Sequence, residues 1–155
     1  MDIIIVGDGK VGYTLAEQLS QEEHNVTIVD TSDEALRKAD EALDVMCVKG
    51  NGASVSTLRE AGAEHADILI AATSMDEINM VSCLTAKHMG TAFTVARVRN
   101  TEYTVDTNRL KRDMGIDLLI NPERATALEI ARLLRFPPAA NIETFYRGRV
   151  EVMSF

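Results

Sequence analysis

The sequence predicts an α/β domain with a doubly wound parallel sheet of six strands. Short β-branched or apolar runs alternate along the chain with segments of helical periodicity, which is typical of parallel strands joined by right-handed crossovers. The strand runs are apolar on both faces, as expected where helices cover both sides of a sheet. The length of 155 residues suits one such domain.

The first half of the chain alternates strand and helix up to residue 72. The expected strands are the runs at 3–6, 26–29, 45–48 and 67–72. The helices expected between them are 11–22, about 31–39, and 55–61. The first helix has one apolar face, formed by Val11, Leu15 and Leu19. Thr31 and Glu34 have the spacing of a capping box, which predicts that Thr31 caps the second helix.

The second half continues the same alternation. Strands are expected at 93–98 and 116–120, and helices at 76–89, 102–114 and 123–135. Gly90 and Gly115 end the first two of these helices, and Asn121 is the expected cap of the third, with Pro122 at its first position. A proline-containing linker follows, and 142–146 and 150–155 alternate like a hairpin. We therefore expect one domain at 1–136, followed by a separate tail at 137–155.

Composition excludes several classes of protein. Lysine and arginine number 16 and aspartate and glutamate 24, so the net charge is −8. An acidic domain repels nucleic acid and anionic lipid, so neither is expected as a partner. The start of the chain lacks the pattern of a signal peptide, and no apolar run approaches the roughly 20 residues of a membrane helix. A soluble cytosolic domain without membrane insertion is expected, with Cys47 and Cys83 as reduced thiols.

A glycine-rich loop follows the first strand. Its residues are Gly7, Asp8, Gly9, Lys10, Val11 and Gly12, a G-x-G-x-x-G string that opens the first helix. In a Rossmann-like domain the first glycine allows the tight turn, the second lets a pyrophosphate approach the backbone, and the third lets the helix pack closely. Asp30 ends the second strand, 23 residues after Gly7, where it can accept hydrogen bonds from ribose hydroxyls and disfavours NADP. The alternative is a glycine turn without a ligand.

Other ligand contacts are expected at the carboxyl ends of the strands. Asn51 follows the third strand and either borders an adenine or belongs to a plain turn. Thr73 and Ser74 follow the fourth strand, where their hydroxyls meet the ligand or Ser74 or Asp76 caps a helix. Arg97 ends the fifth strand.

Two alternatives at these positions stay open. Arg97 pairs either with a phosphate or with Glu77 or Glu123. Lys10 either offsets Asp8 or reaches a phosphate, or it is a solvated residue at a helix start.

The sequence contains no recognised catalytic set. Its histidines, His24, His65 and His88, lie at turns or helix ends away from the expected ligand edge, and no metal-ligand spacing is present. An NAD-dependent oxidoreductase fragment and a dimerisation module without a ligand stay open as alternatives. The helices at 76–89 and 123–135 have apolar residues on more than one stripe, which predicts subunit contacts or tight packing within one domain.

The chain resembles a known family of nucleotide-binding domains, called TrkA-N, KTN or RCK, that regulate Trk- and Ktr-type potassium uptake. The resemblance rests on motifs in the order 3–12, 29–30, 58–62, 66–67, 72–80, 95–97 and 121–123. It implies binding of NAD or NADH, or of ADP or ATP, by Gly7 through Val11, Asp30, Thr73, Ser74 and Arg97. Asp8 departs from the usual small or apolar residue at its position.

The resemblance also implies a role. Members of this family are regulatory subunits and not enzymes, and they form dimers or larger rings. The helix at 123–135 would cross to the partner subunit, and 137–155 would begin a truncated C-terminal regulatory subdomain. Changes in ring conformation would gate a TrkH- or Ktr-type membrane potassium transporter, at the cytoplasmic face of the cell membrane.

Overall fold

The protein is described by a computed structural model that covers residues 1–104, 107–135, 141–145 and 150–154. The chain forms two compact units, Met1–Ile120 and Asn121–Phe155, each described here by itself. The expected domain boundary after residue 136 stays a prediction, and the expected linker at 136–140 lies outside the described residues. Among the described helices, none has the length and apolar character required to cross a membrane.

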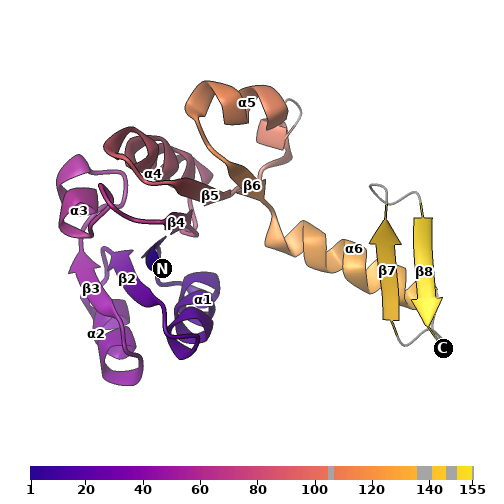
Figure 1. The fold of residues 1–155 in the computed structure, drawn as a ribbon, viewed down its shortest axis with the longest axis horizontal. Helices are drawn as coiled ribbons and strands as arrows, with labels where there is room; N and C mark the ends of the chain where they lie inside the picture. The colour runs from indigo at the N-terminus through magenta and orange to yellow at the C-terminus, as the bar shows by residue number, and fades with distance from the viewer. Residues whose placement is uncertain (105–106, 136–140, 146–149, 155) are drawn as a thin grey trace. The chain divides into compact units, whose positions relative to one another are not determined.

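The first unit is built on one parallel sheet of six strands (Figure 1). These are β1 (Asp2–Val6), β2 (Asn25–Asp30), β3 (Met46–Lys49), β4 (Ile68–Ala71), β5 (Phe93–Arg97) and β6 (Leu118–Ile120). Their spatial order is β3-β2-β1-β4-β5-β6, so the order reverses between β1 and β4. This is the doubly wound arrangement, and it confirms the predicted fold class.

Helices cover both faces of the sheet. They are α1 (Lys10–Gln21), α2 (Asp33–Ala42), α3 (Val55–Glu60), α4 (Asp76–Met89) and α5 (Thr107–Met114), with a 3₁₀ turn η1 (Thr101–Thr104). On the first face, Ile3 and Ile5 of β1 pack with Ala16 of α1 and Ala39 of α2. On the second face, the alternate residues of the strands pack with α3 and α4, forming a separate core cluster.

The observed ends of the elements correct two predictions. The side chain that caps α2 is Ser32, whose Oγ accepts the Ala35 N–H at 3.2 Å, and not the expected Thr31. The helix expected at 102–114 is divided into η1 and α5, with residues 105 and 106 between them outside the described residues. Asn121 caps the next helix as predicted, because its Oδ1 accepts the Arg124 N–H at 2.9 Å.

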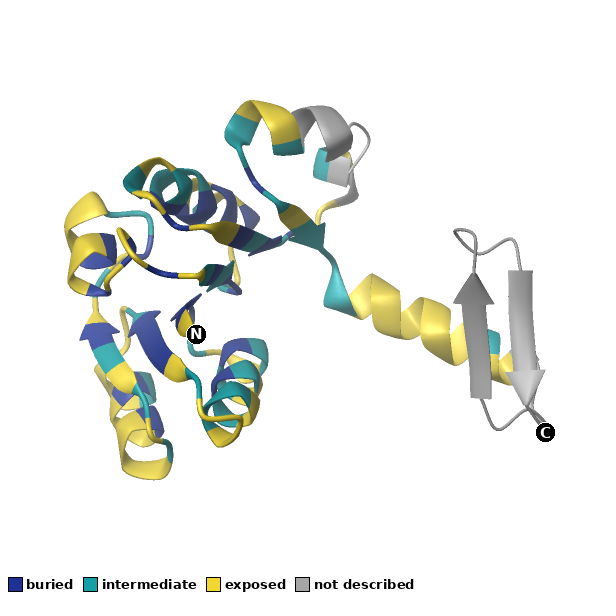
Figure 2. Ribbon diagram, viewed as in Figure 1, coloured by how far each residue is buried: buried dark blue, intermediate teal, exposed yellow. Residues whose placement is uncertain are grey.

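The first face of the sheet is only half covered. Strand register places Ile3, Ile68 and Phe93 in one row, and Ile5, Ile70, Val95 and Leu118 in the next. Ile5 is fully buried under α1 and α2, whereas Phe93 is 42% exposed and Leu118 is 40% exposed. We call Phe93, Val95, Leu118 and Ile120 the open half of this face. In Figure 2, β5 and β6 have exposed positions, whereas β2 is mostly buried.

The helix α4 (Asp76–Met89) packs within its own unit. Met80, Cys83 and Ala86 are buried on the second face, whereas Val81 stays 40% exposed. Packing within one domain therefore accounts for most of the apolar residues of this helix. Cys83 is a buried free thiol, and burial raises its pKa to about 12, which keeps it protonated. Cys47 is a half-buried free thiol.

The second unit contains the helix α6 (Pro122–Arg135) and a hairpin of β7 (Asn141–Phe145) and β8 (Val150–Ser154). The two strands are antiparallel, as predicted. Exposed apolar side chains gather on α6, where Leu128 is 60% and Leu134 73% exposed, together with Ile130 and Leu133. Figure 2 shows this helix exposed along nearly its whole length.

Candidate functional site

The loops after β1 and β4 meet where the strand order reverses. Gly7 ends β1 with a φ of +99°, a conformation that side chains rarely adopt. A Cβ at Gly7 would lie 2.8 Å from the backbone nitrogen of Thr73. Gly7 N–H donates to the Val29 carbonyl of β2 at 2.8 Å. This glycine therefore brings the ends of three strands together.

The two other glycines of the motif have different surroundings. A Cβ at Gly12 would lie 1.8 Å from the carbonyl oxygen of Gly7, so α1 can approach β1 only with glycine there. Gly9 is extended, with φ −75° and ψ −175°, and a Cβ on it would meet no atom within 4 Å. The fold therefore explains glycine at positions 7 and 12, but neither backbone geometry nor packing explains it at position 9.

The N-terminus of α1 lies directly after Gly9. No side chain caps this end, and the first turn contains no acidic residue. The first N–H groups of a helix lack partners within the helix and carry partial positive charge. Such an end is suited to binding a phosphate.

Asp30 shapes the same loop from β2. Its Oδ2 accepts the Asp8 N–H at 2.7 Å, and its Oδ1 accepts the Ser32 N–H at 2.8 Å. A carboxylate has about four acceptor positions, so the half-buried Asp30 retains capacity for further donors such as a ribose diol. The predicted acid thus also holds the glycine loop in place.

A hollow of about 590 Å³ opens beside the glycine loop. It is lined by Asp8, Gly9, Lys10, Tyr13, Thr14, Ser32, Glu34, Ala35 and Lys38. Lys38 lies over the ring of Tyr13, with its Nζ 4.8 Å from the ring centroid. Sequence reasoning missed Tyr13, Ser32 and Lys38, because only the packing of α2 beside α1 brings them to the loop.

Asp8 lies in this hollow in an unfavourable setting for a charge. Burial, followed by the nearby Asp30 carboxylate, raises its pKa to about 6, although Lys38 acts in the opposite direction. Its Oδ1 is buried without a hydrogen-bond partner in the described part of the chain. Lys10, the expected counterion, is exposed.

The loop after β4 is held by Asn79 of α4. Its Oδ1 accepts the Thr73 N–H at 2.8 Å and the Thr73 hydroxyl at 2.6 Å. Its Nδ2 donates to the carbonyls of Thr73, at 3.1 Å, and of Arg97, at 2.9 Å. Asn79 is fully buried, and it joins the ends of β4 and β5. The sequence reasoning did not identify this residue.

Asp76 and Arg99 were also not predicted as a pair. The Asp76 carboxylate is nearly buried and accepts the N–H groups of Arg99, at 2.9 Å, and Asn100, at 2.7 Å. The Arg99 guanidinium donates to the Ser74 carbonyl. Ser74 itself is exposed, and the cap position of α4 is Met75, without a side-chain cap bond. Neither Ser74 nor Asp76 is therefore the cap of this helix.

The remaining predicted residues lie at the expected edge. Asn51 closes its own turn, since its Oδ1 accepts the Ala53 N–H at 2.9 Å. Arg97 is half-buried at the end of β5, in register with Ile120. The structure thus brings Gly7 to Gly12, Asp30 and Thr73 together, while the assignment of all these residues to a ligand stays a prediction.

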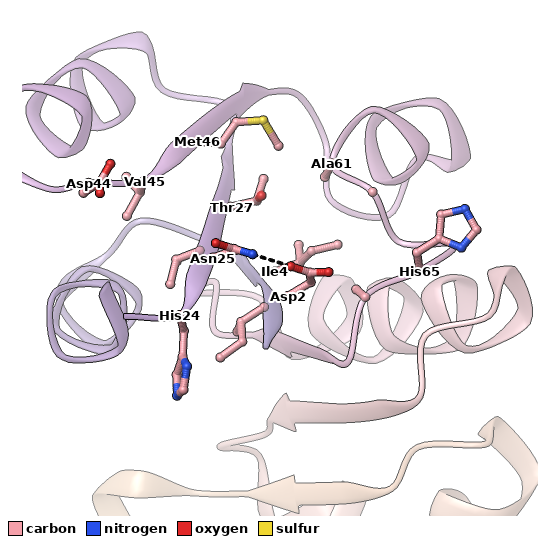
Figure 3. Close-up of a pocket in the computed structure, with 14 residues that line it drawn as sticks. Asp2, Ile4, His24, Asn25, Thr27, Asp44, Val45, Met46, Ala61 and His65 are labelled. Atoms are coloured by element: carbon pink, nitrogen blue, oxygen red, sulfur yellow. Dashed lines mark hydrogen bonds between the residues drawn. The ribbon is translucent and has the colours of Figure 1, made fainter. Parts of the chain in front are cut away.

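A second hollow, of about 450 Å³, lies at the opposite edge of the sheet (Figure 3). Residues at the amino ends of β1, β2 and β3 line it, among them Asp2, Asn25 and Met46. Two of its polar residues bind each other, since Asn25 Nδ2 donates to Asp2 Oδ1 at 2.8 Å, and Asp2 N–H also donates to Asp67 at 2.8 Å. Ligands of doubly wound sheets bind at the carboxyl edge, so this hollow is not the candidate site.

The strand order and the glycine loop at its reversal point define a Rossmann-like α/β domain. The model of the TrkA-N domain family matches residues 3–122. The chain belongs to this family, which confirms the resemblance found in its sequence motifs.

Curated relatives carry the name Trk system potassium uptake protein TrkA. The protein from Halomonas elongata is 41% identical over 156 residues, which are 99% of this chain and 34% of that protein. The protein from Haemophilus influenzae is 39% identical over 156 residues, with the same coverage of 99% and 34%. The chain therefore spans about a third of the length of these relatives.

Solved structures share the fold. The TrkA-N domain of the inner membrane protein YbaL from Escherichia coli has a TM-score of 0.75 at 22% identity, covering 85% of this chain and 95% of that chain. The GsuK channel bound to NAD has a TM-score of 0.64 at 21% identity, covering 76% of this chain and 21% of that chain. GsuK has also been solved bound to ADP.

Proposed function

We propose that this domain binds an adenine nucleotide, either NAD(H) or ADP or ATP, at the carboxyl edge of β1, β2 and β4. The surroundings of Gly9 carry the proposal. A glycine there is explained by close approach of a ligand to the backbone, since in the described part of the chain nothing beyond its sequence neighbours lies within 4 Å of a Cβ built on it. The binding of NAD and of ADP by GsuK, a protein with the same fold, is consistent with this.

Each residue has a distinct role in this proposal. The N–H groups at the start of α1 bind the pyrophosphate, and Gly9 leaves room for it. The acceptor positions that Asp30 retains bind the ribose hydroxyls, and its charge disfavours a 2′-phosphate. Thr73, Ser74 and Arg97 bind the part of the ligand beyond the pyrophosphate, and Asn51 borders the adenine.

Isothermal titration with NAD, NADH, ADP and ATP tests the proposal. We expect Gly9→Ala to weaken binding at least tenfold, because the new methyl group enters the ligand's space. Gly9 is also the N-cap of α1, where alanine is disfavoured, so the free energy of unfolding should fall by about 1 kcal/mol at most. Gln18→Ala, on the exposed side of the same helix, is the matched control and should bind normally. If none of the four nucleotides binds, or if Gly9→Ala binds as tightly as the unaltered chain, the proposal is wrong.

We also propose a regulatory and not a catalytic role in potassium uptake. The names of the curated relatives support this. The mechanism would be a difference in nucleotide affinity between two conformations of an assembly, peripheral at the cytoplasmic face of a TrkH- or Ktr-type membrane subunit. A nucleotide-dependent change in assembly, measured by light scattering, would support it. Substrate-dependent oxidation of NADH would contradict it.

We also propose that the assembly is a homodimer or a larger ring formed through α6. The open half of the sheet presents Phe93 and Leu118, and α6 presents Leu128 and Leu134, all exposed. An apolar sheet face and an apolar helix of the same chain are complementary, and burying both removes apolar area from water. The proposed occupant of the open half is therefore α6 of a second copy.

A further inference from the structure

The carboxyl group of Asp8 is an unusual component of a loop that binds an anion. It lies between Gly7 and Gly9 and lines the hollow in front of Gly9. In the described part of the chain, no donor reaches its buried Oδ1. Burying a carboxylate oxygen without a hydrogen bond is costly, and the cost falls when the group is protonated.

The groups around Asp8 come from four elements. Asp30 of β2 is the nearest carboxylate, and it receives the backbone N–H of Asp8 itself at 2.7 Å. Lys38 and Glu34 of α2 and Lys10 and Tyr13 of α1 line the same hollow. Cys47 of β3 is affected by Asp8, whose charge is among the causes that raise the pKa of its thiol. Among these charges, Asp30 raises the pKa of Asp8 and Lys38 lowers it, and together with burial the result stays well above the ordinary value.

We propose that Asp8 takes up a proton when a nucleotide binds, so that the affinity of this site rises as the pH falls from 8 to 6. The inference rests on the proposed nucleotide binding. A pyrophosphate at the N-terminus of α1 places two further negative charges next to Gly9, one residue from Asp8. A charged Asp8 opposes them, whereas a protonated Asp8 does not and gains an O–H donor. The proton comes from solvent, and no covalent bond changes.

The direction of the effect follows from linkage. In the free domain the pKa of Asp8 is about 6, and the ligand's charge raises it further. Affinity is then greatest below pH 6, falls as the pH rises through the interval between the free and bound pKa values, and is constant above it. A further rise of about one unit corresponds to roughly a tenfold change in affinity.

NAD is the probe that isolates this effect. A terminal phosphate takes up a proton near pH 6, and ADP and ATP each end in such a phosphate. In NAD each phosphate is bonded to a ribose and to the other phosphate, so NAD has no terminal phosphate to titrate in this range. Titration calorimetry at pH 6, 7 and 8, in buffers with different heats of ionisation, measures both the affinity and the protons exchanged. For a rise of one unit in the pKa of Asp8, we expect roughly fivefold weaker binding at pH 8 than at pH 6, and net proton uptake near pH 6.5.

Two variants identify the group that takes up the proton. Asp8→Asn should bind independently of pH, with an affinity at pH 8 at least equal to that of the unaltered chain at pH 6. Asp33→Asn removes the same charge from an exposed ion pair with Lys49 and should retain the pH dependence. If Asp8→Asn does not fold, Asp8→Ala and a carbon NMR titration of the Asp8 carboxyl, with and without NAD, provide the same comparison.

The outcomes separate this inference from the proposed function. If NAD binds but the pH dependence is absent, or is equal in the unaltered chain and Asp8→Asn, the role of Asp8 is wrong and nucleotide binding stands. If NAD does not bind but ADP does, the pH dependence of ADP affinity is compared between the unaltered chain and Asp8→Asn. The titration of ADP itself affects both proteins equally, so a difference between them supports the role of Asp8 and its absence contradicts that role. If no nucleotide binds, both proposals are wrong.

Discussion

The two halves of the first sheet face differ in what covers them. Ile3 and Ile5 of β1 and Ile28 of β2 are almost completely buried under α1 and α2. On β5 and β6 of the same sheet, Phe93 and Leu118 remain about two-fifths exposed. Both halves belong to one continuous hydrogen-bonded sheet. The comparison teaches that an apolar strand pattern predicts a covered face without saying which element, or which copy of the chain, covers it.

The largest difference is expected in stability. Ile5→Ala should lower the free energy of unfolding by about 2–5 kcal/mol, because it leaves a cavity in a fully buried site. Phe93→Ala in the open half should lower it by only about 1–2 kcal/mol when measured on the dilute monomer, since the ring is already partly in water. Urea unfolding followed by circular dichroism measures both. Equal losses would show that the open half is covered within one chain.

The second expected effect is on self-association. Phe93→Glu and Leu134→Glu should each weaken the proposed dimer about hundredfold, because each would bury a charge without a partner at the interface. Monomer stability should hardly change for Leu134→Glu, at a side chain that is 73% exposed, and should fall by about 1–2 kcal/mol for the half-exposed Phe93. Val55→Glu, at another exposed apolar residue, is the control and should leave association unchanged. Sedimentation velocity measures the dissociation constant, and unaltered association of both variants would exclude this interface.

The smallest expected effect concerns the attachment of β6. Asp117 Oδ2 accepts the Thr94 N–H of β5 and the Lys87 ammonium of α4, each at 2.8 Å. Burial alone would raise the pKa of Asp117, but the bonds from Lys87 and Thr94 outweigh it and hold the pKa below the ordinary value of 3.8. A lowered pKa contributes stability above pH 3.8 that is lost as the pH falls below it.

Asp117→Asn tests this attachment. We expect a loss of about 1 kcal/mol at pH 7, because the pair is partly exposed and screened. The difference from the unaltered chain should disappear as the pH falls through 4 and below in thermal melts. Asp44→Asn, at an exposed carboxylate in the connection between α2 and β3, is the control and should behave like the unaltered chain. A difference that does not shrink as the pH falls below 3.8 would contradict the role of this ion pair.

Most of the fold could be predicted from the sequence, because the spacing of apolar residues differs between the strands and the helices. Gly90 ends α4 as predicted, with a φ of +124°. The cap of α2 was misplaced by one residue since Thr31 and Ser32 are both good caps. The choice between them depends on Asp30, whose Oδ1 accepts the Ser32 N–H and so fixes the chain before the helix.

The candidate site was predictable only where residue types carry the signal. Positions 7 and 12 have no room for a side chain, and position 30 needs a carboxylate that accepts hydrogen bonds. Each requirement restricts the residue type, so a sequence motif can reveal it. Asn79 forms hydrogen bonds with backbone groups of residues 6 and 18 positions away. Every residue type offers the same backbone groups, so the identity of the partner residues gives no sign of these bonds. Tyr13 and Lys38 meet only because α1 and α2 pack side by side, which no local spacing indicates.

Asn79 also has a mechanical consequence. One buried amide binds the backbone of Thr73 after β4 and of Arg97 at the end of β5. The two strand ends therefore cannot separate without breaking several hydrogen bonds at once, and they move as a single body. A force applied at Thr73 is transmitted to the strand that carries Phe93, and so to the open half of the sheet.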